Sequence, residues 1–293
     1  MKEHVIQKIT KDEKYRVTVD VEEYAENPLY LCDFPLHVND WDKNYSLVGR
    51  KNNEFDSVRK LLEHLLTWFG DGDKIIEKLI GNGKSDFHNE YDTALKYDRR
   101  GKQWNLKYWT KSNNEGHWAT LCEYDCKKEE LDVFDILYEA TDECISDLAC
   151  DCMTDKVKIV GYSFGPYGEI GFRNNFTSES ITGIAYLIKD ECVGDGKWFT
   201  EEQWNSQTCI QLAKPEIEEI EAWSEGRVYY FKVEKSSQYR IHKACLSEQK
   251  PMECYTTTEW EEIDSCHGFY GSPQYAFEYA LNDNDLKKED FDD

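Results

Sequence analysis

Lys214-Pro-Glu-Ile-Glu-Glu-Ile-Glu-Ala-Trp-Ser-Glu-Gly-Arg-Val-Tyr-Tyr-Phe-Lys-Val-Glu234 decides the fold, because a helical pattern in it passes directly into a strand pattern. Pro215 lies in the first turn, carboxylates follow near the positive end, and Gly226 ends the segment, which predicts a short helix. Val228 to Glu234 is rich in β-branched and aromatic residues and predicts a strand. Helix and strand in direct succession indicate a mixed fold.

The same two patterns recur along the chain. Apolar spacing of three and four residues predicts helices at Phe55 to Phe69, Ile75 to Ile80, Glu129 to Leu148 and Tyr275 to Leu281. Strands are expected at Tyr15 to Val21, Leu29 to Phe34, Trp104 to Trp109, His117 to Tyr124, Val157 to Phe164, Ile181 to Ile188 and within Trp260 to Gly271. Short polar turns, such as the one at Ser112 to Gly116, indicate hairpins. The predicted class is α+β, with antiparallel sheets flanked by short helices.

The chain of 293 residues is near the size at which one core divides into two domains. Its character changes near Asp151 to Lys156. We therefore expect an N-terminal α+β domain at residues 1–153 and a C-terminal α+β domain at residues 154–282. Residues 283–293 are expected to be a frayed acidic tail.

Acidity is the dominant bulk property. The chain has 59 Asp and Glu against 35 Lys and Arg, a net charge of −24. Aromatic residues make up 14% of it, which is typical of a folded protein rather than of a disordered acidic segment. Such a charge repels nucleic acid and anionic membranes and attracts basic surfaces, of which proteins that bind DNA or RNA are the commonest. We expect no direct nucleic acid or membrane partner.

The start of the chain is charged and lacks the apolar stretch of a signal peptide, and no apolar run approaches the ~20 residues of a membrane span. A cytoplasmic location is expected, with most of the 11 cysteines as reduced thiols.

No catalytic pattern stands out. The densest cysteine group is Cys122, Cys126, Cys144, Cys150 and Cys152, but the spacing of the last two is too tight for a usual zinc knuckle, so structural thiols are favoured. Cys266 and His267 are adjacent on an expected strand and point to opposite faces, which argues against a thiol–imidazole pair. We expect no catalytic residue, no metal and no cofactor, and hence no enzyme.

A resemblance lies in the last third. Ile181 to Ile188, Trp223 to Phe231 and Ile263-Asp-Ser-Cys-His-Gly-Phe-Tyr-Gly271 resemble small proteins of phages and mobile elements with a "VYGF … DSCWGFYG" signature. Tyr230 stands where that family has Gly, and His267 where it has Trp. The overall profile is similar to Gabija anti-defence proteins of phages, which bind a nuclease–helicase defence complex as oligomers. The resemblance implies an anti-defence inhibitor, a homo-oligomer and a host defence complex as partner.

One segment departs from the acidity. Basic and aromatic residues alternate between Lys96 and Lys111, a pattern compatible with a single-strand platform, a protein-contact surface or an exposed hairpin with solubilising charges. The net charge opposes the first. The expected partner-binding residues are Tyr97, Arg99, Arg100, Trp104, Tyr108 and Trp109, together with the acidic helix residues Glu218, Glu219 and Glu221.

Three functions remain open from the sequence. The first is a phage anti-defence protein that binds a bacterial nuclease–helicase complex and blocks DNA binding or cleavage. The second is a general DNA mimic, whose carboxylates would imitate phosphates and whose binding would fall steeply with salt. The third is an enzyme that depends on a cysteine–zinc site or on carboxylates.

Overall fold

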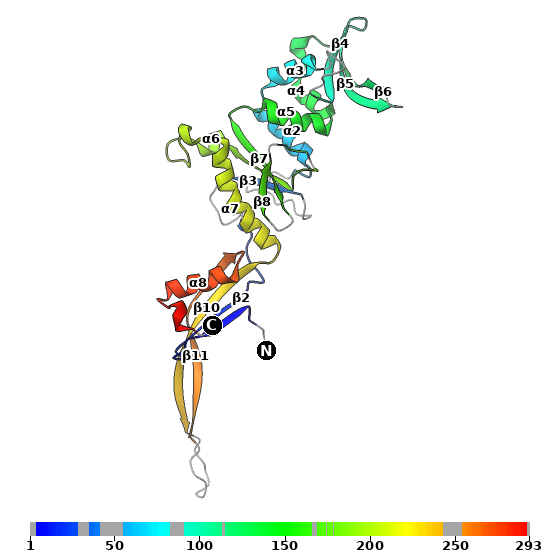
Figure 1. The fold of residues 1–293 in the computed structure, drawn as a ribbon. Coiled ribbons are helices and arrows are strands. Elements are labelled where there is room, and N and C mark those ends of the chain that lie inside the picture. Colours follow the sequence, from blue (N-terminus) through cyan, green and yellow to red (C-terminus); the bar gives the residue numbers. More distant parts are fainter. Residues whose placement is uncertain are drawn as a thin grey trace. The chain divides into compact units, whose positions relative to one another are not determined.

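The computed structural model describes residues 4–28, 35–41, 55–82, 91–112, 115–165, 169–173, 175–177, 179–242 and 254–291 (Figure 1). The chain divides into two compact units. The first unit combines Met1–Cys32 with Glu216–Asp293, and the second is Asp33–Pro215. Helices account for part of each unit and all three sheets are antiparallel, so the predicted α+β class is confirmed.

The units do not follow the domains expected from the sequence. Leu148 and Cys152, before the expected boundary, share one hydrophobic core with Val157 and Ile184, which follow it. The second unit therefore continues through residues 153 and 154 without a break. The first unit is made from both ends of the chain because β2 (Tyr15–Val21) pairs with β10 (Val228–His242). Pairing between distant segments is decided by tertiary contacts and leaves no local mark on the sequence.

The first unit is a four-stranded sheet covered by one helix. The strand order is β1 (Ile6–Ile9), β2, β10 and β11 (Cys254–Tyr270). Helix α8 (Pro273–Asp283) packs on one face, as the ribbon shows (Figure 1). The core between them is small and consists of Val17, Val19, Phe231, Val233, Phe269, Ala276, Phe277, Ala280, Leu281 and Phe291. Alternate residues of β2 and β10 supply it, as a half-buried strand requires.

The expected frayed tail is instead folded, so that expectation is wrong. Phe291 is only 4% exposed, and its ring lies 5.7 Å from that of Phe277. The Lys11 amide donates to the Asp290 carbonyl over 2.8 Å, and η3 (Lys288–Asp290) precedes the contact. Burial of one phenylalanine, worth about 1.5–3 kcal/mol, outweighs the local acidity.

The second unit contains a second four-stranded sheet. Its order is β3 (His37–Asp40), β9 (Gly183–Ile188), β7 (Val157–Phe164) and β8 (Ile170–Arg173). Short helical segments α6 (Lys189–Cys192) and η2 (Glu201–Gln203) follow, and then α7 (Ser206–Ser224). Helix α7 begins eight residues before the predicted Lys214, with Pro215 inside it at the point where the two units divide.

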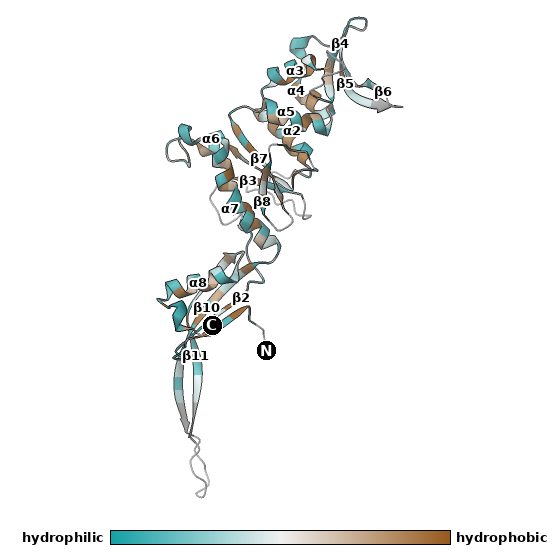
Figure 2. Ribbon diagram, in the orientation of Figure 1, coloured by the Kyte–Doolittle hydropathy of each residue, from teal (hydrophilic) through white to brown (hydrophobic). Residues whose placement is uncertain are grey.

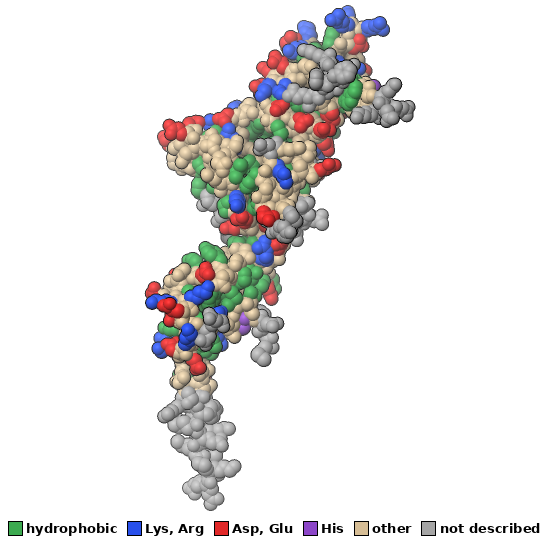
Figure 3. Space-filling model, in the orientation of Figure 1, with side chains coloured by type: hydrophobic (Ala, Val, Ile, Leu, Met, Phe, Trp, Pro, Cys, Tyr) green, Lys and Arg blue, Asp and Glu red, His purple; other side chains and the backbone are tan. Residues whose placement is uncertain are grey.

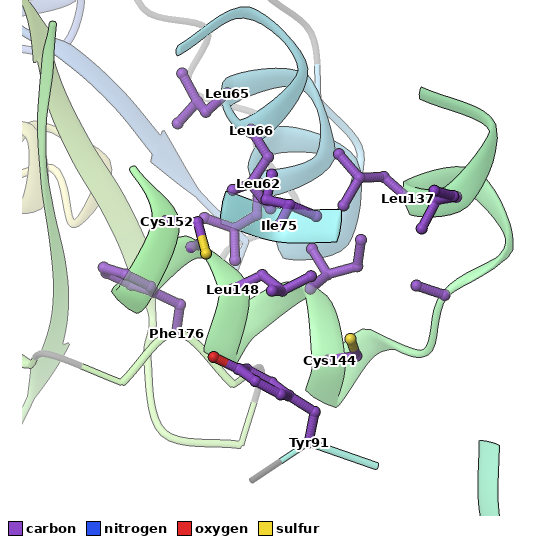
Figure 4. Packing of buried hydrophobic residues seen from close by; sticks show 14 of the residues in the cluster. Leu62, Leu65, Leu66, Ile75, Tyr91, Leu137, Cys144, Leu148, Cys152 and Phe176 are labelled. Atoms are coloured by element: carbon purple, nitrogen blue, oxygen red, sulfur yellow. The ribbon is translucent and has the colours of Figure 1, made fainter. Parts of the chain in front are cut away.

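A helical layer and a three-stranded sheet complete the second unit. The helices are α2 (Val58–Phe69), α3 (Gly72–Gly81), η1 (Lys128–Glu130), α4 (Val133–Glu139) and α5 (Asp142–Cys152), and the sheet is β4 (Thr93–Asp98), β5 (Gln103–Ser112) and β6 (Glu115–Tyr124). Leu62 and Leu66 of α2 pack against Leu148 of α5 and Ile75 of α3 (Figure 4). The hydropathy colouring shows the apolar side of these helices turned inward (Figure 2).

The predicted helix Glu129 to Leu148 is two helices with a break at Thr141, so its continuity was wrong. The Thr141 hydroxyl caps α5 by accepting from the Cys144 amide and donates to Asp92 over 2.6 Å. Such a cap outcompetes continuation of the preceding helix. The predicted strand Leu29 to Phe34 lies outside the described residues. The other predicted helices and strands are confirmed, with shifted ends.

Candidate partner-binding surfaces

The turn between β4 and β5 carries the predicted basic residues. Arg99 and Arg100 are exposed there, and the Arg100 amide donates to the Asp98 side chain over 2.9 Å. Lysine and arginine side chains gather at this end of the second unit in the space-filling view (Figure 3). The turn is thus a positively charged tip on an acidic protein.

Tyr97 and Trp104 lie directly opposite each other next to this turn. Their ring centroids are 5.2 Å apart. They form one wall of a shallow hollow of about 630 Å³. Its lining residues are Tyr97, Lys102, Trp104, Asp125, Cys126, Lys127, Lys128, Glu129 and Glu130. Because the hollow is lined by as many carboxylates as ammonium groups, its charge favours neither anionic nor cationic ligands strongly.

Trp109 lies on the other face of the same sheet. Leu106 points into the core, Lys107 points outward, and Trp109 is two residues further on, so it shares the outward face. There its ring contacts Trp118 at 5.4 Å, and the Lys96 ammonium lies 4.3 Å from the centroid of Trp118. The structure therefore divides the predicted surface: Tyr97, Trp104 and Tyr108 lie on one face and Trp109 on the other.

The predicted acidic residues belong to α7 in the first unit. Glu218 is exposed, whereas Glu219 and Glu221 are half-buried. Burial raises the pKa of Glu219 above its usual range. The three carboxylates and the basic tip thus belong to different units.

A feature that the sequence analysis missed is a projecting two-stranded ribbon. β10 and β11 stay in unbroken register from Glu234↔Glu262 to His242↔Cys254. β2 accompanies β10 only to the pair Lys235↔Tyr15, with one further bond from the Ser236 amide to the Lys14 carbonyl. Beyond this point the two strands pair only with each other in the described part of the chain. The sequence signal for it is limited to the β-branched run Thr256 to Thr258, which precedes Trp260.

The ribbon is open on its faces as well. Tyr239 is 51% exposed, and Thr258 and Glu259 are exposed. The ribbon loses the hydrophobic colour that marks the strands beneath α8 (Figure 2). An isolated two-stranded hairpin is marginally stable in water, so its base needs support.

That support comes from the sheet face opposite α8. The Arg16 guanidinium binds Glu234 over 2.6 Å and lies 4.7 Å from the ring centroid of Trp260. On the same face of the sheet, four residues before Glu234 in β10, Tyr230 stacks on His267. Their ring centroids are 5.1 Å apart and their planes are 11° from parallel. The second bulge of β11 places His267 and Gly268 opposite Tyr230.

Burial disfavours the thiolate form of four cysteines in the described part of the chain. Burial raises the pKa of Cys150 and Cys152 to about 11 and that of Cys209 to about 12, and it also raises the pKa of Cys144. A raised pKa leaves little thiolate at neutral pH. The Cys266 thiol lies 3.7 Å from the carbonyl of His267, its own neighbour. Among the described residues, no group of three or more His, Cys, Asp or Glu could hold a metal ion.

A second hollow, of about 320 Å³, lies where α2 meets the start of α5. It is lined by Val58, Arg59, Leu62, Asp142, Glu143, Phe176, Thr177 and Glu179. The Arg59 guanidinium at its side donates to the carbonyls of Tyr138 and Ala140, each over 2.7 Å, and to Asp142 over 2.6 Å. Arg59 therefore ties α2 to the end of α4 and the first turn of α5.

No protein family model, curated protein or solved structure matches this chain. Of the helices in the described part, none combines the length and apolar character that a bilayer crossing requires.

Proposed function

We propose that the protein is a phage-encoded anti-defence inhibitor that binds a bacterial nuclease–helicase defence complex of the Gabija type and blocks DNA binding or cleavage. The observation that carries the proposal is the β10–β11 ribbon. Its distal part has two open edges and two uncovered faces within the described residues. Long unpaired edges are usually avoided because they recruit other chains. A protein that keeps one gains a surface for binding a partner.

Charge supports a basic partner. The net charge of −24 produces long-range attraction toward a DNA-binding surface and accelerates encounter with it. The phage signature in Ile263 to Gly271 adds a mobile-element origin. Several copies acting together would increase the avidity for a large complex, so a homo-oligomer is part of the proposal.

The experiment is a capture assay with a shortened ribbon. Residues 238–258 are replaced by Asn-Gly, a dipeptide that favours a two-residue hairpin turn. Tagged wild-type and shortened proteins are incubated with a purified Gabija nuclease–helicase complex, washed at about 0.15 M and about 0.5 M salt, and assayed for inhibition of DNA cleavage. The wild type should hold the complex through the higher salt and inhibit cleavage, and the shortened protein should do neither. An unchanged melting temperature of the shortened protein would show that the α8 core is intact.

The alternative is a general DNA mimic, which the exposed carboxylates of α7 and β11 favour. Several carboxylates elsewhere are neutralised in pairs, such as Glu262 with Lys232 at 2.8 Å and Asp155 with Lys189 at 3.0 Å. Release of many DNA-binding proteins at about 0.5 M salt, with equal capture by the shortened protein, would favour the mimic and contradict the proposal.

A further inference from the structure

We infer that the outer edge of β11, from Thr257 to Glu262, receives an extended Lys- or Arg-bearing segment of the partner as an additional antiparallel or parallel strand. This inference rests on the proposed function, since it names the chemistry of the segment that the ribbon binds. In such binding, main-chain hydrogen bonds supply the affinity and the carboxylates select the segment, which is the usual division of roles in strand addition.

The main chain of this edge is available. β11 is the last strand of its sheet. Between Thr257 and Glu262, no backbone hydrogen bond to anything other than β10 occurs among the described residues. The register with β10 is regular here, so the outward N–H and C=O groups are evenly placed for another strand.

The part of the same edge that lies beside α8, from Ile263 onward, is blocked. One bulge leaves Ile263 without an opposite residue on β10, and it is 47% exposed. A second bulge contains Gly268, whose φ of 81° few residues other than glycine adopt. Bulges twist an edge away from flat pairing. The edge is thus protected beside α8 and regular only in the distal ribbon.

Charge selects the occupant. β11 contains Glu259, Glu261, Glu262 and Asp264 and no Lys or Arg. Glu262 binds Lys232, and Asp264 accepts from Asn284 over 2.7 Å. Glu259 and Glu261, both exposed, remain on the regular stretch. They share one face, because they are two residues apart on a strand. A strand with cations at alternate positions would place them beside these carboxylates.

The test uses a defined probe. It is a fluorescein-labelled peptide of about eight residues that alternates lysine and valine. A second peptide has the same sequence with N-methyl groups on alternate backbone amides, which keeps the charge and removes one row of donors. Binding to the full chain is followed by fluorescence anisotropy at about 0.05 M and about 0.15 M salt. The unmodified peptide should bind, and the methylated one should bind roughly tenfold or more weakly.

The variant Glu259→Lys/Glu261→Lys should also weaken the unmodified peptide by roughly tenfold. The matched control is Glu77→Lys/Glu202→Lys, which makes the same change of charge on exposed residues of the other unit and should leave the affinity within about twofold. Equal binding of both peptides, equal loss in both variants, or no binding by wild type would overturn the inference. If the shortened ribbon abolishes capture of the defence complex while Glu259→Lys/Glu261→Lys captures it normally, the proposed function stands and only this inference fails.

Discussion

Tyr230 of β10 stacks on His267 of β11 in a nearly parallel arrangement, with 11° between the ring planes. The Glu22 side chain contacts the same part of β11. It accepts a hydrogen bond from the Gly268 amide over 2.9 Å and lies 3.5 Å from the His267 ring nitrogen. Tyr230, His267 and Glu22 therefore belong to one cluster of contacts on this face of the sheet.

This contact predicts that substitutions of Tyr230 and His267 have coupled effects on stability. Tyr230→Ala and His267→Ala should each lower the free energy of unfolding by about 0.5–1 kcal/mol, the usual value of a cross-strand aromatic pair. His267 is 62% exposed by its side chain, so little burial adds to this. The double variant should lower the free energy of unfolding by less than the sum of the two single losses, because either single substitution already removes the contact between the rings. Urea unfolding of the four proteins measures this, and strict additivity would show that the rings do not interact.

Arg59 predicts a larger effect in the second unit. Arg59→Ala removes four hydrogen bonds that join α2 to α4 and α5 and should lower the free energy of unfolding by about 2–3 kcal/mol. Arg59→Lys should recover little of it, because a single ammonium lacks the planar fork that reaches three carbonyls and a carboxylate.

The control for Arg59 is Lys60→Ala on the next residue. Lys60 makes only an exposed pair with Asp56 at 2.7 Å, so the loss should stay below about 0.5 kcal/mol. Since alanine is the better helix former, helix propensity cannot account for a loss in either variant. If Lys60→Ala costs as much as Arg59→Ala in chemical denaturation, the Arg59 contacts do not explain the effect.

Asp151 predicts a pH dependence. It accepts hydrogen bonds from Lys78 and from the Tyr91 hydroxyl, and these hold the pKa of its carboxyl below the usual value. A lower pKa in the folded state stabilises the protein above the unfolded pKa of about 3.9, and this contribution is lost as pH falls through the folded pKa. Asp151→Asn should therefore cost about 1 kcal/mol near neutral pH, a modest value because the side chain is 39% exposed. The difference between the two proteins should shrink below about pH 4. A difference independent of pH in unfolding curves would mean that charge plays no part.

Glu219 predicts a pH dependence of stability that is opposite in sign to that of Asp151. Its pKa is raised by burial on α7, so the ionised form destabilises the folded state, and this penalty grows as pH rises through the raised pKa. Glu219→Gln should raise the melting temperature at neutral pH and lose this advantage in acid. Glu218→Gln, one residue away and exposed, should change little at any pH. Equal shifts for the two variants would contradict a role for burial.

The predicted partner surface shows where local reasoning stops. The strand patterns at Trp104 to Trp109 and His117 to Tyr124, joined by a polar turn, predicted the hairpin of β5 and β6 correctly. Alternation along β5 already assigns Trp104 and Trp109 to opposite faces, because they are five residues apart. It could not show that β4 pairs with β5 and places Tyr97 directly opposite Trp104, because β4 was not among the predicted strands.

The sequence by itself determined most of the elements, because apolar spacing and strand alternation act over a few residues: the leucines of α2 and the pattern of β2 were sufficient. Only the tertiary structure decided that β2 pairs with β10 across more than two hundred intervening residues. It likewise decided that Phe291 is buried and that the β10–β11 ribbon extends beyond its sheet. These outcomes depend on which apolar faces meet and where a neighbouring strand ends, and neither is encoded in a local pattern.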